Sequence, residues 1–147
     1  MYSHLVITAG ISGITARNVL GKALRAEPGP LAYPPEAQNP ALQNGATEED
    51  ALNHVRSIAR RNEILQAMRD APKFVSAEFS LLNALRQQGR LHDCPRVVLL
   101  HTASLGGRVA ATGIAALLES AFGATCHPRE IGDLDTRDPQ SVQKGLG

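Results

Sequence analysis

The stretch "VVLLHTASLGGRVAATGIAALL", Val97 to Leu118, decides the fold. It begins as a run of β-forming residues without polar alternation, which is typical of a buried strand. It then passes through a turn of small residues and becomes helical, with Gly, Ser and Thr at the junction. The pattern predicts a strand that leads into a helix, with a gap of ligand size at the turn.

A similar unit comes earlier in the chain, and a third strand follows. "HLVITAG", His4 to Gly10, predicts a short buried strand, and Thr15 to Arg25 predicts a helix with one apolar stripe. "ATCHPREIG", which follows a helix end at Gly123, predicts the third strand. Buried strands that alternate with helices indicate an α/β fold of the Rossmann-like class, with a mainly parallel sheet and right-handed crossovers.

Three strands are few for such a sheet. Either a strand lies in the proline-rich residues 26–47, or sequence that would supply further strands is absent. Because five of the nine prolines fall in 26–47, we expect a surface loop there. Too little chain precedes this loop to form a core of its own, so we expect one domain over residues 1–147.

Helix caps divide most of the remaining chain. Thr47 is expected to begin a helix that Pro72 closes, and Ser76 to begin another that Gly89 ends. The chain after the third strand begins with an acidic loop. There, Asp138 and Pro139 predict the N-cap and first residue of one more helix.

Composition restricts the kind of partner and the compartment. The net charge is +1, so a long nucleic acid would not be held by charge alone and an anionic ligand must be bound locally. The two cysteines form no C-x-x-C pair, which favours free thiols in a reducing compartment, by default the cytoplasm. No apolar run approaches the ~20 residues of a membrane helix, and no secretory leader is expected.

The two strand ends carry the candidate ligand-binding residues. In an open parallel sheet, ligands bind at the carboxyl ends of the strands, where helix N-termini offer unpaired N–H groups. Glycines there allow close approach of the backbone, hydroxyls donate hydrogen bonds, and an arginine adds charge. The candidates are Gly10, Ile11, Ser12 and Gly13 after the first strand, and His101, Thr102, Ser104, Gly106, Gly107 and Arg108 after the second. Tight packing of strand against helix also explains the glycines without a ligand.

Common nucleotide and catalytic motifs do not match these turns. Gly10 to Gly13 lacks the G-x-G-x-x-G spacing, the "GK" at Gly21 lacks the rest of a P-loop, and Ser12 has no G-x-S-x-G frame. The five histidines show no paired ligand spacing, so neither a metal nor a cofactor is expected. His101 can either contact a bound base or fill space at the strand end.

Four blocks in order give a family resemblance: "HLVITAGIS", "VSAEFSLLNAL", "VVLLHTASLGGRVAA" and "REIGDLDTRDPQSVQKGL". Together they resemble the CARF domain, the CRISPR-associated Rossmann fold that senses cyclic oligoadenylates in type III CRISPR defence. Such domains carry a first strand ending in G-T-S, a helix beginning S-A-E, and a later S-D-T-x-x-G-R. The resemblance implies a Rossmann-like three-layer fold.

The resemblance also implies roles for particular residues. Ser12 matches a ligand-contacting serine, Thr102 and Ser104 match hydroxyl positions, and Gly107 and Arg108 match the G-R pair. Two residues depart from the family pattern. Ile11 stands where threonine is usual, and Ala103 stands where aspartate is usual.

The function that the resemblance implies is that of a regulatory binding module. It would bind a cyclic oligoadenylate, with the tetra-adenylate favoured, across the two-fold axis of a homodimer, and it would act on an effector domain or partner outside this chain. Two alternatives stay open. One is a metal-independent ring nuclease, in which a ribose 2′-OH attacks the adjoining phosphate. The other is a Rossmann-like domain that binds a different small nucleotide.

Overall fold

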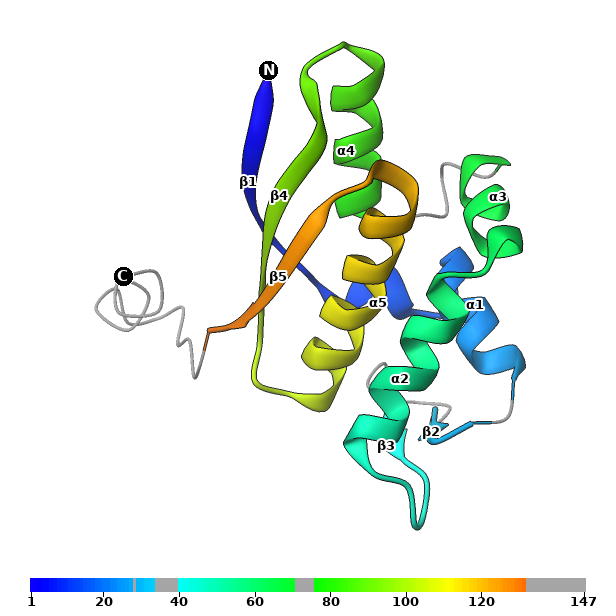
Figure 1. The fold of residues 1–147 in the computed structure, drawn as a ribbon. Helices are drawn as coiled ribbons and strands as arrows, with labels where there is room; N and C mark the ends of the chain where they lie inside the picture. The colour runs from blue at the N-terminus through cyan, green and yellow to red at the C-terminus, as the bar shows by residue number, and fades with distance from the viewer. Residues whose placement is uncertain (28, 34–39, 71–75, 132–147) are drawn as a thin grey trace.

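A three-stranded parallel sheet in the order β1-β4-β5 lies along one side of the molecule (Figure 1). The computed structural model describes residues 1–27, 29–33, 40–70 and 76–131. Its sheet strands are β1 (Tyr2–Thr8), β4 (Leu91–His101) and β5 (Thr125–Glu130). The α/β fold and the parallel sheet predicted from the sequence are confirmed, and so is the third strand.

The described helices form two layers on one side of this sheet (Figure 1). The inner layer holds α5 (Leu105–Phe122) and α4 (Ala77–Gln87), which contact β4 and each other. The outer layer packs on α5 and holds α1 (Val19–Ala26), α2 (Glu48–Ala59) and α3 (Asn62–Asp70). The described layers therefore run sheet, helix, helix, and a short 3-10 helix, η1 (Ile11–Ile14), joins β1 to α1.

Register explains why only one face of the sheet is buried. Residues paired across parallel strands share a face, and the row Ile7, Leu99 and Pro128 faces α5. Leu99 is fully buried in this row. The next row, Val6, Val98 and His127, faces the other way, and Val6 is 67% exposed.

Small residues let α5 lie in the middle of the fold. A helix that is apolar on all sides must be buried on all sides, and α5 has the sheet on one side and α2 on the other. A Cβ at Gly113 would lie too close to the side-chain ends of Leu20 in α1 and Val55 in α2. The glycine therefore allows both helices to approach α5 closely. Ser104 caps its N-terminus, and Gly123, in the left-handed region at φ 64°, ends it.

The first predicted helix begins later than expected. The chain turns through η1 and then through Thr15 to Asn18 before α1 starts at Val19. α1 then makes a close crossing with this turn, because Gly21 lies against its backbone and a Cβ at Gly21 would overlap the carbonyl oxygen of Thr15. Arg25 fastens the crossing by donating hydrogen bonds to the carbonyls of Ile14 (2.7 Å) and Gly21 (3.0 Å).

The single helix predicted from Thr47 to Pro72 is also wrong, because the chain breaks it at Arg60 and Arg61 into α2 and α3. Arg61 forms a bidentate ion pair with Glu27, just after α1, and this contact lies at the break. The break lets α2 pack on α5 while α3 packs on α1. Pro72 lies outside the described residues.

Other differences concern strands. The proline-rich loop contains two short strands, β2 (Leu31–Ala32) and β3 (Ala41–Leu42), which pair antiparallel and stay separate from the main sheet. β4 begins at Leu91, earlier than the predicted Arg96, through an irregular register beside β1. The helix predicted at Asp138 and Pro139 falls outside the described residues.

Replacing Gly21 with alanine tests the close crossing of α1. Alanine in a helix interior normally stabilises by up to about 1 kcal/mol over glycine. At Gly21 we expect the opposite, a loss of about 2 kcal/mol in the free energy of unfolding, because the new Cβ meets backbone. Gly113→Ala is the matched control, since its Cβ meets side-chain ends, and it should lose less. Urea denaturation measures both, and a stabilised Gly21→Ala protein would contradict the crossing.

Candidate functional site

The two predicted loops lie side by side at one edge of the sheet. Because β1 and β4 are parallel neighbours, their carboxyl ends meet there, and the Ala9 N–H donates to the Leu100 carbonyl at 2.8 Å. β1 leads into η1, and β4 leads into α5. A Cβ at Gly13, within η1, would lie 3.5 Å from Ile114 of α5, so the two segments pack on each other.

The first loop is held by a residue that the sequence did not single out as a site residue. The Gly10 N–H donates to Oε1 of Glu78 at 3.2 Å. Glu78 is only 6% exposed, and its other oxygen, Oε2, is buried without a hydrogen-bond partner in the part of the chain that the structure describes. Its one signal in the sequence was its place in the quoted S-A-E block. A carboxylate therefore already occupies one backbone donor of the loop.

Other residues of this first loop are positioned by packing. Ile11 is half-buried against the core. Gly13 lies beside the start of α4, and a Cβ there would approach that of Ser76 to 3.0 Å. The side chain of Ser12 lies outside the described part of the structure, so its predicted ligand contact stays a prediction.

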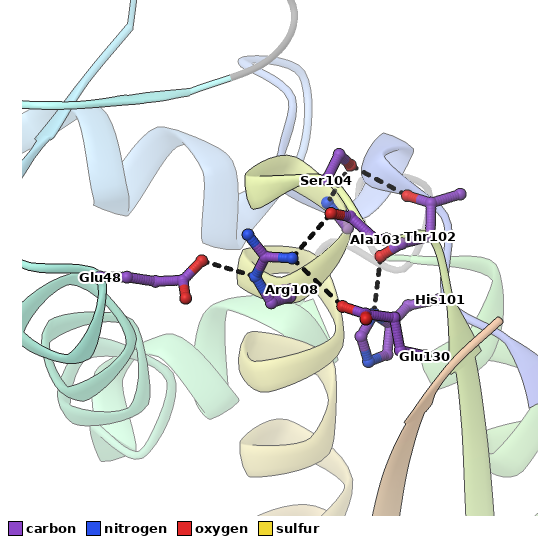
Figure 2. Close-up of polar contacts among 8 residues, drawn as sticks. Glu48, His101, Thr102, Ala103, Ser104, Arg108 and Glu130 are labelled. Atoms are coloured by element: carbon purple, nitrogen blue, oxygen red, sulfur yellow. Dashed lines mark hydrogen bonds and ion pairs between the residues drawn. The ribbon is translucent and has the colours of Figure 1, made fainter. Parts of the chain in front are cut away.

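The second loop is a capped helix start (Figure 2). Ser104 Oγ accepts a hydrogen bond from the Gly107 N–H at 3.0 Å, and it lies 2.9 Å from Oγ1 of Thr102. Gly106 and Gly107 are buried, and a Cβ at Gly107 would overlap the side chain of Thr102. Tight packing thus accounts for Gly107, while Thr102 and Ser104 remain exposed to solvent.

Arg108 is engaged on several sides (Figure 2). Its Nε donates to Glu48 at 2.5 Å, and its Nη1 donates to the carbonyl of Ala103 at 2.7 Å and to Glu130 at 3.2 Å. The hydrogen bond that Arg108 donates to Glu48, together with the one it donates to Glu130, raises the pKa of Arg108 above its ordinary value. One guanidinium thus ties the turn to the start of α2 and to the end of β5.

His101 is oriented by the backbone. It is 7% exposed, and its Nδ1–H donates to the Thr102 carbonyl at 2.9 Å. In this structure the imidazole fills space at the end of β4. Its contact with a bound base stays a prediction.

The titratable groups that the structure describes do not form a metal site. Among the residues that the structure describes, no group of three or more His, Cys, Asp or Glu side chains is placed to hold a metal ion. Both cysteines are free; Cys94 is exposed and Cys126 is half-buried. Burial, with a smaller effect of Glu119, raises the pKa of Cys126 to about 12.

The described helices include none with the length and apolar character needed to cross a membrane. Neither a scan of known protein families nor a search of curated proteins finds a match to this chain.

The cap on α5 gives a stability prediction. Ser104→Ala removes the acceptor for the Gly107 N–H and should lower the free energy of unfolding by about 1 kcal/mol. Ser104→Asp keeps an acceptor at the helix N-terminus and should keep the stability. Ser80→Ala, at an exposed position within α4, is the control and should change stability little. Equal stability of Ser104→Ala and Ser80→Ala in urea denaturation would contradict the cap.

The two thiols should differ in reactivity. Because the pKa of Cys126 is about 12, only about one in ten thousand of its thiols is ionised at pH 8, and the thiolate is the reactive form. Iodoacetamide at pH 8 should modify Cys94 and leave Cys126 unmodified in the folded protein, as read by peptide mass spectrometry. Raising the pH toward 10 should speed the reaction of Cys126, and urea should make both thiols react. Equal rates in the folded state would contradict the burial of Cys126.

Proposed function

We propose that this chain is a cyclic oligoadenylate-binding sensor domain of type III CRISPR defence. The observation that carries the proposal is the meeting of two strand-end loops, 10–14 and 102–108, at one edge of a parallel sheet. Ligands of open α/β sheets bind at this edge. The CARF resemblance of the same two loops supplies the ligand class.

An anionic ligand would be bound by particular polar groups of the site and not by the overall charge of the chain. With a net charge of +1, the protein must hold phosphates by backbone N–H groups, hydroxyls and single cations. Thr102 and Ser104 present exposed hydroxyls at the start of α5, where the helix dipole favours negative charge. The proposed ligand is a ring of adenylates, with the tetra-adenylate favoured.

A symmetric ring calls for a symmetric receptor. In the proposed complex, two copies of the chain pair about a two-fold axis and the ring lies across it, so that each copy supplies one pair of loops. Binding is then relayed to an effector, either a further domain or a separate partner. The proposed role is regulatory, and ligand cleavage is the alternative that the same experiment addresses.

Titration with cyclic tetra-adenylate tests the proposal, with Ser104→Asp as the informative variant. Aspartate keeps the helix cap but places a negative charge against the ligand's phosphates, so we expect affinity to fall at least about tenfold. Gln87→Glu makes the same charge change at the exposed C-terminal end of α4 and should leave affinity unchanged. Calorimetry gives the dissociation constants, and light scattering gives the number of copies bound.

The outcomes separate the alternatives. No heat with any cyclic oligoadenylate, together with binding of a mononucleotide, favours a different nucleotide-binding role and contradicts the proposal. Linear products after incubation with labelled ring identify a ring nuclease. Equal affinities of Ser104→Asp and Gln87→Glu would place the ligand away from the α5 turn.

A further inference from the structure

The cation of the candidate site has two anionic partners within the chain. Glu48 lies 2.5 Å from Nε of Arg108, and Glu130 lies 3.2 Å from Nη1 (Figure 2). Two carboxylates around one guanidinium leave the cluster with a net negative charge. A ligand phosphate that approaches Arg108 therefore meets a guanidinium whose positive charge is already neutralised by two carboxylates.

The neighbouring loop shows the same arrangement. The Gly10 N–H, a backbone donor of the type that binds phosphate, is occupied by the carboxylate of Glu78. Both loops thus have an anion-accepting group that a carboxylate of this chain fills. Glu48, Glu78 and Glu130 come from three different elements, α2, α4 and β5.

We propose that Glu48 and Glu130 occupy the place of an anionic ligand group and are displaced from Arg108 when that ligand binds. The inference rests on the proposed function for the identity of its ligand. Binding is then an exchange of anions at one guanidinium. Its output is mechanical, because Glu48 lies in the first turn of α2 and Glu130 is the last residue of β5.

Because the ion pairs of Arg108 are partly exposed, breaking them costs little free energy. The side chains of Arg108, Glu48 and Glu130 are 33%, 38% and 47% exposed, so water competes with each ion pair and each contributes little to stability. A phosphate can accept two parallel hydrogen bonds from a guanidinium, a stronger arrangement than either carboxylate makes here. Arg108 also donates to the carbonyl of Ala103, so a change of partner is felt directly in the turn.

Removing one competing charge should strengthen ligand binding. Glu130→Gln keeps the shape of the side chain and removes its charge, and we expect cyclic tetra-adenylate to bind about three- to tenfold more tightly. Glu119→Gln is the matched control, because it makes the same charge change on α5 beside Arg60, away from the two loops. It should change affinity less than about twofold. Glu48→Gln should act like Glu130→Gln.

A double substitution tests whether Arg108 mediates the effect. In an Arg108→Gln background there is no guanidinium to release, so adding Glu130→Gln should give no further gain. Thermal unfolding of each variant checks that it is folded. If Glu130→Gln binds no more tightly than Glu119→Gln, or if its gain persists without Arg108, the exchange is overturned.

Sodium pyrophosphate separates this inference from the proposed function. Added pyrophosphate should raise the melting temperature of the Glu130→Gln protein more than that of the Glu119→Gln protein. If this holds while no cyclic oligoadenylate binds, the anion exchange stands and the sensor proposal fails. If the ring binds but the two variants respond equally to both anions, the exchange fails and the sensor proposal stands. If neither anion binds any variant, both fail.

Discussion

Parallel pairing between β1 and β4 brings two distant segments into register, with Leu5 beside Val97 and Ile7 beside Leu99. Because the strands run the same way, the chain leaves both at one edge, and the hydrogen bond from Ala9 to Leu100 extends the pairing into the loops. η1 and α5 therefore start next to each other. A ligand that touches both loops depends on this single register.

The sequence predicted those features of the fold that depend only on residues close together in the chain. The predicted cap residues Thr47 and Ser76 mark helix starts because each accepts a hydrogen bond from the backbone N–H three residues later. The break at Arg61 could not be predicted, because it coincides with an ion pair to Glu27 from another part of the chain. The close crossing at Gly21 likewise involves backbone that only the folded chain brings near.

The candidate site shows the same division. Its strand-turn-helix shape and its position at the sheet edge follow from local patterning. The partners of its polar groups do not, since Glu48, Glu78 and Glu130 come from elements far along the chain. In a protein with a net charge of +1, such internal contacts determine which N–H groups and cations are free to bind an anion. The sequence alone predicted Gly10 and Arg108 as candidates but not the carboxylates that contact them.

Hydrogen exchange of the two loops tests most directly whether they form one site. Mass spectrometry should follow the amides of residues 10–14 and 102–108 as cyclic tetra-adenylate is added. The predicted result is slower exchange in both loops, with the same midpoint concentration, because one ligand contacts both. Protection of one loop without the other, or protection confined to other parts of the chain, would contradict a shared site.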